Sequence, residues 1–186
     1  MRIIAGSDRG RRLKTPSGRG VRPTIDRVKE ALFNILGDLV VDSRFLDLFA
    51  GAGGVGIEAL SRGANQVVFV ELDARHVEII RENLELCGFS DRARVYRNDA
   101  ARACQILGQK GVRFDIIFAD PPYGRGLHSS ILGQIDQAGI LRAGGVVVLE
   151  HGSRDLVPSS TAHLKFSRTE RYGDTQLSFY LRQDEI

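Results

Sequence analysis

Short apolar runs alternate with amphipathic stretches along most of this 186-residue chain. Runs of this length that end at a turn or a polar residue are typical of buried strands, and we expect strands near residues 45–48, 67–70, 93–97, 115–119 and 146–150. Apolar residues at helical spacing predict helices near residues 24–36, 57–60, 74–86, 100–107 and 129–138. Alternating strands and helices indicate a doubly wound α/β sheet whose strands are mostly parallel.

The last part of the chain has a different pattern. Two strand-like runs, 165–171 and 176–181, flank the turn Tyr172-Gly-Asp174, which predicts a hairpin and thus an antiparallel strand at the end of the sheet. The four histidines, which are His76, His128, His151 and His163, form no ligand constellation and are expected on the surface or in loops. Cys87 and Cys104 stand alone, so we expect inert thiols and no metal site.

A glycine-rich turn follows the first predicted strand. Gly51, Gly53 and Gly56 match the G-x-G-x-x-G pattern between a strand and a helix, and Glu71 ends the next strand twenty residues after Gly51. A single match of this kind is weak, because a tight turn can require glycine for steric reasons alone. An acid at the distance suited to ribose hydroxyls favours a bound nucleoside.

The charge around this turn distinguishes two classes of cofactor. Asp47 lies four residues before Gly51, and Glu71, Asp99 and Asp120 should converge on the same edge of the sheet. Several carboxylates would repel the pyrophosphate of a dinucleotide at short range. S-adenosylmethionine carries a sulfonium and an ammonium and no phosphate, so the acidic rim favours it over NAD.

The predicted strand 115–119 ends in Asp120-Pro121-Pro122-Tyr123. Two prolines cannot continue a strand ladder, so the chain leaves the sheet in a fixed, extended shape. An acid, a rigid carbonyl and an aromatic ring are thereby held at the carboxyl end of a strand, where open α/β sheets bind ligands. Asp120 and the Pro121 carbonyl could accept the N–H groups of an exocyclic amine, while Tyr123 stacks on the base.

Positive charge is concentrated at the start of the chain. Residues 1–30 hold nine Lys/Arg and three Asp/Glu, a net of +6, which leaves −3 for the other 156 residues. We expect residues 1–20 to form a basic, flexible or hairpin-like arm, attached to a domain of residues 21–186. Six basic residues are candidate RNA contacts, namely Arg9, Arg11, Arg12, Lys14, Arg22 and Arg27. The last two flank the first helix and could touch RNA or the cofactor instead, and a solvated tail is the alternative for the arm.

Taken together, these motifs resemble those of a known group of enzymes. The segments Asp47–Gly56, Glu71, Asn98-Asp99-Ala100 and Asp120–Tyr123 are similar, in order and spacing, to the motifs of class I, Rossmann-like methyltransferases. Arg2-Ile-Ile-Ala-Gly6, Arg9-Gly-Arg11 and the segment from Arg22 to Asn34 further resemble the bacterial 16S rRNA guanine-N2 methyltransferases. That family often has phenylalanine where this chain has Tyr123, and either ring can stack.

The resemblance implies a fold and a function. The fold is a seven-stranded, mostly parallel sheet with one antiparallel strand. The function is transfer of a methyl group from S-adenosylmethionine to a guanine of 16S rRNA, with the small ribosomal subunit as partner. It assigns the cofactor to Asp47, Gly51, Gly53, Gly56, Glu71, Asp99 and Ala100, and the chemistry to Asp120, Pro121, Pro122 and Tyr123.

Three other functions stay open at this point. A DNA adenine or cytosine amino-methyltransferase shares the Asp-Pro-Pro-aromatic motif, and an NAD-dependent oxidoreductase shares the glycine turn. An RNA-binding assembly factor without catalytic activity would share the basic arm. No secretory signal and no apolar run of membrane length is present, so we expect a soluble, cytoplasmic protein with no membrane partner.

Overall fold

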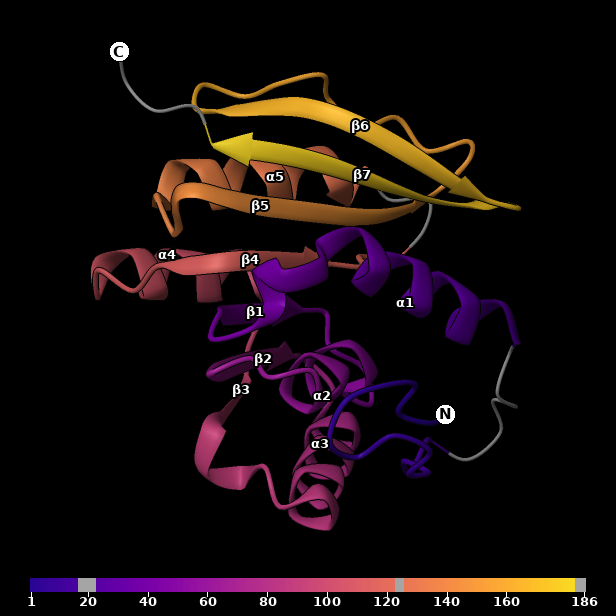
Figure 1. Cartoon of the computed structure of the whole chain (residues 1–186). Helices are drawn as coiled ribbons and strands as arrows, with labels where there is room; N and C mark the ends of the chain where they lie inside the picture. The colour runs from indigo at the N-terminus through magenta and orange to yellow at the C-terminus, as the bar shows by residue number, and fades with distance from the viewer. Residues whose placement is uncertain (17–22, 123–125, 183–186) are drawn as a thin grey trace.

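One seven-stranded sheet runs through the molecule (Figure 1), whose computed structural model describes residues 1–16, 23–122 and 126–182. Its strands follow the spatial order β3-β2-β1-β4-β5-β7-β6. Their bounds are β1 (Arg44–Leu48), β2 (Gln66–Glu71), β3 (Ala93–Arg97), β4 (Phe114–Ala119), β5 (Leu141–Gly152), β6 (Leu164–Tyr172) and β7 (Thr175–Arg182). All strands predicted from the apolar runs are present, and β5 begins five residues earlier than expected.

Strand direction confirms a doubly wound, mostly parallel sheet with one antiparallel strand. The first five strands pair in parallel, and β7 is antiparallel to both of its neighbours, β5 and β6. We expected the antiparallel strand at the end of the sheet, but β7 lies one position inside the edge. The reason is burial: Leu177, Phe179 and Tyr180 of β7 are buried, whereas most of β6 is exposed, so the more apolar strand takes the inner position.

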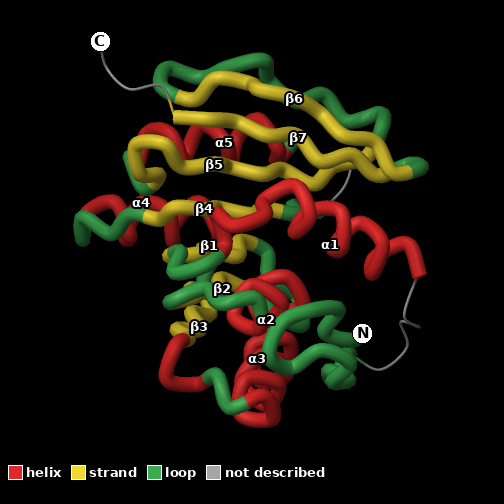
Figure 2. Tube along the Cα trace, in the orientation of Figure 1, coloured by secondary structure: helices red, strands yellow, loops and turns green. Residues whose placement is uncertain are grey.

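Five α-helices cover the two faces of the sheet (Figure 2) in the described part of the chain. They are α1 (Pro23–Leu36), α2 (Gly54–Ser61), α3 (Ala74–Cys87), α4 (Ala100–Gln109) and α5 (Leu127–Ala138). Two short 3-10 helices, η1 (Gly37–Val40) and η2 (Ser90–Arg92), were not predicted. None of the helices in the described ranges combines the length and apolar character that a membrane crossing needs.

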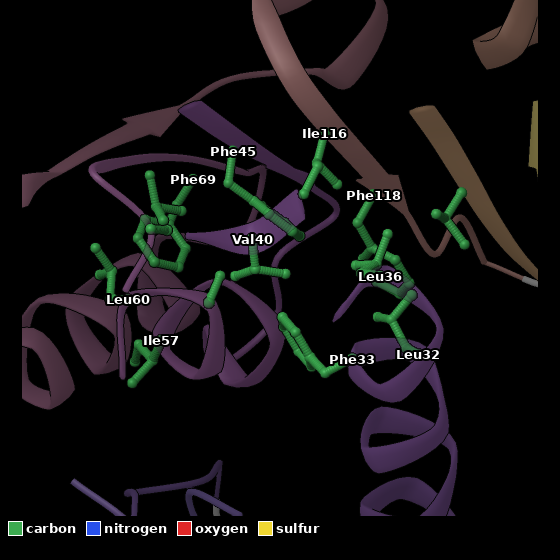
Figure 3. Packing of buried hydrophobic residues seen from close by; sticks show 14 of the residues in the cluster. Leu32, Phe33, Leu36, Val40, Phe45, Ile57, Leu60, Phe69, Ile116 and Phe118 are labelled. Atoms are coloured by element: carbon green, nitrogen blue, oxygen red, sulfur yellow. The ribbon is translucent and has the colours of Figure 1, made fainter. Parts of the chain in front are cut away.

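The core consists of two layers, one on each side of the sheet. Side chains of α1, α2 and α3 pack with Phe45, Phe69 and Phe118 in one layer, while α4 and α5 pack against the other face. Figure 3 shows the first layer, where Phe33 of α1 meets Phe45 of β1 with ring centroids 6.3 Å apart. Because strand side chains alternate between faces, Asp47 shares the α1 face with Phe45.

Residues 1–14 form a hairpin that packs against the domain. Ile3 and Leu13 are buried at 1% and 6% exposure, and the two strands of the hairpin bond through Ile3 N–H to the Arg11 carbonyl at 3.0 Å. The Asn83 side chain of α3 accepts the Lys14 N–H at 2.8 Å and donates to the Lys14 carbonyl at 3.0 Å. Figure 1 shows this segment beside α2 and α3.

The expectation that all four histidines lie on the surface or in loops is wrong for two of them. His151 of β5 is buried, and its Nε2 lies 2.8 Å from Ser178 Oγ of the neighbouring β7. His128 of α5 is buried with its ring edge-on to that of His151, at 5.9 Å. Cys87 and Cys104 are both buried, and burial raises the pKa of the Cys104 thiol to about 12. Within the described residues, no three or more His, Cys, Asp or Glu side chains are arranged so that they could hold a metal ion.

Candidate active site at the carboxyl ends of the strands

A cavity of about 160 Å³ lies between α1 and the carboxyl ends of β1, β4 and β5. Three acids line it, Asp47, Asp120 and Glu150, together with Lys29 of α1 and the apolar side chains of Val28, Leu32, Phe49 and Phe118. A larger hollow of about 460 Å³ lies between α4 and α5, but glutamines and small residues line it and no acid or base does. Two further hollows, of about 170 and 340 Å³, are lined by acids and bases but lie at the amino ends of β4 and β5. Of these hollows, the cavity at the carboxyl ends of the strands is the one that Asp47 and Asp120 line, so it is the candidate site.

Asp47 ties the first strand to the glycine turn. Its carboxylate accepts the Gly56 N–H at 2.9 Å, and the residue is 1% exposed. The pKa of Asp47 is raised to about 7, chiefly by burial; the Gly56 N–H opposes the shift, and the nearby charges of Asp120 and Glu71 contribute to it. Asp47 thus holds the turn in place and faces the cavity with a carboxyl that titrates near neutrality.

Glycine is required at the three positions of the turn for different physical reasons. Gly51 and Gly53 have φ angles of +56° and +82°, which side chains rarely tolerate. Gly56 is required by packing, because a Cβ there would lie 2.3 Å from the ring of Phe69. The sequence pattern alone does not distinguish these reasons.

Glu71 joins the glycine turn to the end of β2. One carboxylate oxygen accepts the Gly51 N–H at 2.7 Å and the other accepts the Asp73 N–H at 2.9 Å. Each oxygen keeps a second lone pair, which suits the hydroxyls of a ribose. The geometry therefore fits the role predicted for Glu71.

The segment after β3 lies beside Glu71. The Asn98 N–H donates to the Glu71 carbonyl at 3.1 Å, which places Asp99 near the end of β2. Asp99 is exposed and caps α4 by accepting the Arg102 N–H at 3.0 Å. Ala100 is buried at 5% exposure in the core below α4.

Asp120 follows β4 and is joined by an acid that was not predicted, Glu150 of β5. Burial raises the pKa of Asp120 to about 7, and burial together with the charge of Asp120 raises the pKa of Glu150 to about 8. Pro121 is buried and Pro122 is exposed, whereas Tyr123 lies outside the described residues. A signal for Glu150 was present, because Val146-Val-Val-Leu-Glu150 ends an apolar run in an acid, as the strand before Glu71 does.

A second buried charge group, also not predicted, connects the hairpin to the domain. Glu58 of α2 is 0% exposed and accepts the N–H groups of Ile4 and Ala5 at 2.8 and 3.0 Å. Its carboxylate also lies 2.8 Å from Arg62 Nε and 3.4 Å from Lys29 Nζ. Lys29 in turn donates to the Arg2 carbonyl at 2.7 Å, and burial lowers the pKa of its ammonium.

Five of the six basic residues predicted to contact RNA lie in the described part of the chain, and none of these five lines the cavity. Arg11 is paired with Asp8 at 2.8 Å, and Lys14 with Glu82 at 2.9 Å. Arg9 and Arg12 are exposed on the hairpin and Arg27 is exposed on α1. Arg22 lies outside the described residues.

Backbone strain marks one further residue of the site. Phe49 follows β1 directly with a φ of +61°, an unusual angle for a residue with a side chain, and it lines the cavity. Strain of this kind clusters at functional sites. No local sequence signal predicts it, because the angle is imposed by the path from β1 into the glycine turn.

The groups around the cavity fit a cationic nucleoside better than a dinucleotide. Within the described residues, the cationic side chain that lines the cavity is that of Lys29, whose ammonium is already engaged by Glu58 and the Arg2 carbonyl. A pyrophosphate would face Asp47, Asp120 and Glu150 instead. A sulfonium and an ammonium would instead be attracted by these acids and would neutralise their negative charge.

Comparison with known proteins yields consistent relatives. A model of the family described as Conserved hypothetical protein 95 matches residues 1–181. YlbH of Bacillus subtilis is 40% identical over 183 residues, 98% of this chain and all of that protein. Ribosomal RNA small subunit methyltransferase D of Escherichia coli K12 is 36% identical over 98% of this chain and 90% of its own length. The solved structure of YhhF from Escherichia coli superposes with a TM-score of 0.84 at 36% identity, covering 100% of this chain and 99% of that one.

Proposed function

The chain belongs to the Conserved hypothetical protein 95 family, and we propose that it methylates ribosomal RNA of the small subunit, using S-adenosylmethionine. More closely defined, the proposed acceptor is the exocyclic N2 amine of one guanine in 16S rRNA. The methyltransferase name of the Escherichia coli relative supports the broader reaction. The observation that carries the proposal is Asp120, a half-buried acid after the end of β4 that lines the cavity beside the glycine turn.

The cofactor would be held by residues around the turn. Glu71 has free lone pairs for the ribose hydroxyls, Asp99 lies beside it for the adenine amine, and the Gly51–Gly53 turn admits the methionine part. When bound, S-adenosylmethionine supplies a methyl group attached to a positively charged sulfur. Asp47, as the most deeply buried of the acids lining the cavity, balances that charge.

Asp120 has two tasks in this reaction. Its carboxylate accepts an N–H of the target amine and so aims the nitrogen lone pair, whose orientation supplies much of the acceleration. As the nitrogen forms its new bond to the methyl carbon, the bond from that carbon to sulfur would break and leave a neutral thioether, and the carboxylate would take the proton that the nitrogen loses. A pKa near 7 suits a group that must accept a proton at neutral pH. The Pro121 carbonyl is proposed as the second acceptor for the amine.

RNA binding is assigned to surfaces outside the cavity. The target base must leave its stack to reach Asp120, and Tyr123 is proposed to stack on it there. The hairpin presents Arg9 and Arg12 to solvent, and they would contact phosphates of the RNA backbone. We retain residues 1–20 as the RNA-binding arm and residues 21–186 as the methyltransferase domain. Arg22 and Arg27 remain candidates for the mouth of the site.

The test is a transfer and mapping experiment. The protein and methyl-labelled S-adenosylmethionine are incubated with small subunits from cells that lack the enzyme, and the RNA is digested to nucleosides. Label in N2-methylguanosine at one position is the expected result, with Asp120→Asn as the inactive control. Label in methylated adenine or cytosine, label in DNA, or RNA binding without any transfer would each refute the proposal.

A further inference from the structure

Asp120 and Glu150 occupy neighbouring positions at the end of the sheet. The preceding residues, Ala119 of β4 and Leu149 of β5, are register partners in adjacent parallel strands. Adjacent strands lie about 4.8 Å apart, so the positions that follow are within reach of one ligand. Val148 belongs to the core layer under α1 and Leu149 to the other layer, so alternation turns Glu150 toward the cavity that Asp120 also lines.

These two carboxyls differ from the other acids at the site. Asp47 already accepts a backbone N–H from Gly56, Glu71 accepts two, and Asp99 accepts one. Among the described residues, none donates a hydrogen bond to the carboxyl of Asp120 or of Glu150. Two partly exposed carboxyls, to which no described residue donates, therefore line one cavity from adjacent strand ends, and this arrangement suits a ligand with two adjacent donors.

We propose that Glu150 is a second substrate-binding carboxyl, which accepts the ring N–H of the target base while Asp120 accepts an N–H of its exocyclic amine. This inference rests on the proposed function. Guanine presents a ring N–H directly beside its amine, whereas adenine and cytosine present a ring nitrogen that is an acceptor. A carboxylate opposite that acceptor would be repelled, so Glu150 would select guanine.

The charge state of the pair follows from its surroundings. Three other residues with charged or titratable groups line the same cavity in the described part of the chain. They are Asp47 of β1, Lys29 of α1 and Met1, which carries the α-amino group. Burial raises the pKa of Asp120 to about 7 and of Glu150 to about 8, so the pair retains a proton near neutrality. Two N–H donors favour the form in which both carboxyls are ionised, so transfer should rise with pH between 7 and 8.

The first experiment compares Glu150→Gln with a matched control, Glu170→Gln. Both glutamates are register partners of Leu177 in β7, Glu150 from β5 on one side and Glu170 from β6 on the other. Glu170 differs in that it pairs with Arg168 at 3.7 Å and does not line the cavity. For Glu150→Gln we expect kcat/KM on small subunits to fall about 10- to 100-fold, the effect of losing one hydrogen bond to a charged group. Its rate should also lose the rise between pH 7 and 8. Affinity for S-adenosylmethionine, measured by calorimetry, should stay within about twofold.

The second experiment changes the base and keeps the wild-type protein. Small subunits are reconstituted with 2-aminopurine at the mapped nucleotide, which retains the amine and lacks the ring N–H, or with 6-thioguanine, which retains both. We expect weak transfer to 2-aminopurine and substantial transfer to 6-thioguanine. In Glu150→Gln the gap between the two bases should narrow, because an amide can donate to the ring nitrogen.

The outcomes separate this inference from the proposed function. Failure of the wild-type protein to form N2-methylguanosine would remove the proposed function itself. If that product forms but Glu150→Gln keeps wild-type activity and pH profile, or wild-type protein methylates 2-aminopurine as well as 6-thioguanine, Glu150 does not read the base. Loss of cofactor binding in Glu150→Gln would assign the residue to the cofactor instead. Because the base substitutions use wild-type protein, the inference stays testable even if the variant fails to fold.

Discussion

Two groups of charged side chains meet at Lys29 and differ in how their charges are balanced. In the first, the paired cluster of Glu58, Lys29 and Arg62, the carboxylate has two cationic partners and two backbone donors. In the second, the acid cluster of Asp47, Asp120 and Glu150, burial raises all three pKa values to about 7 or 8. Buried charges are tolerated when paired, and buried acids without partners retain their protons instead.

The contrast indicates a division of tasks. The paired cluster joins the hairpin, α1 and α2, which are remote in sequence, so its charges stabilise the fold. The acid cluster lowers the stability of the fold, because the charges of its acids are not neutralised. Such a loss of stability is expected where a site is adapted to its ligand. Substitutions in the two clusters should therefore affect different measurements.

The largest effect is expected for Asp120→Asn, measured as methyl transfer. Removing a positioned proton acceptor should lower the rate about 10²- to 10⁴-fold. The free energy of unfolding should not fall, because the variant removes a half-buried acid whose charge has no partner among the described residues. Asp174→Asn, at the exposed β6–β7 turn, serves as the control. If Asp120→Asn loses activity and stability together, the acid cluster also supports the fold and the division fails.

The opposite pattern is expected for Glu58→Ala. Lys29, 3% exposed, would be left buried beside a missing partner, and the Ile4 and Ala5 N–H groups would lose their acceptor. Breaking a buried ion pair from one side costs about 3–5 kcal/mol of the free energy of unfolding, which urea titration would measure. Adding Lys29→Met should recover part of this loss. A loss below about 1 kcal/mol would mean that water already shields the cluster.

The pH dependence of stability should come from the acid cluster. The pKa of Asp47 is raised from 3.8 to about 7 on folding, so its contribution is fully present below pH 3.8 and is lost as the pH rises through 7. The free energy of unfolding should therefore fall over this window, by roughly 1.4 kcal/mol per pKa unit at most. Asp47→Asn should flatten the curve. A wild-type curve that is flat from pH 4 to 8 would contradict the raised values.

A smaller effect is expected for Glu71→Ala on cofactor binding. Losing charge-assisted hydrogen bonds should weaken the affinity for S-adenosylmethionine by about 1–3 kcal/mol, as calorimetry would show. The Gly51 N–H would also lose its acceptor, so the turn should loosen. Glu78→Ala on the exposed side of α3 is the control. Unchanged affinity in a folded Glu71→Ala protein would remove this residue from the cofactor site.

The smallest effect is expected for RNA binding by the hairpin of residues 1–14, which the paired cluster joins to the domain. Replacing Arg9 and Arg12 by alanine should reduce the slope of RNA affinity against salt by about one per lost phosphate contact at most. Lys110 and Arg113, exposed at the amino end of β4 and thus at the far edge of the sheet, provide the matched control. If both double variants change the slope equally, the hairpin contributes only general positive charge.

The sequence predicted those features that arise locally. Glu71 and Asp120 each end an apolar run, and Asp47 lies one residue before the end of β1. Because parallel strands bring their carboxyl ends to one edge, the convergence of these acids could be foreseen. Glu58 could not be, because its partners Ile4 and Ala5 lie 54 and 53 residues away and the hairpin must dock before the contact exists. The same limit applies to whole elements. The turn at 172–174 predicts that β6 and β7 pair with each other. It does not predict that β7 takes the inner position, which depends on which of the two strands buries more surface.

The position of β7 has a consequence for the synthesis of the protein. Strands β5 and β6 precede it in the chain, yet β7 lies between them and contributes Leu177 and Phe179 to one core layer and Tyr180 to the other. A nascent chain that has emerged only as far as β6 therefore exposes the unpaired edge of β5, an edge to which other chains can add strands. At about 5–20 residues per second, translation of β6 and β7 leaves this edge open for on the order of a second or more. A pause of the translating ribosome within this stretch would lengthen the exposure and favour aggregation of the unfinished chain.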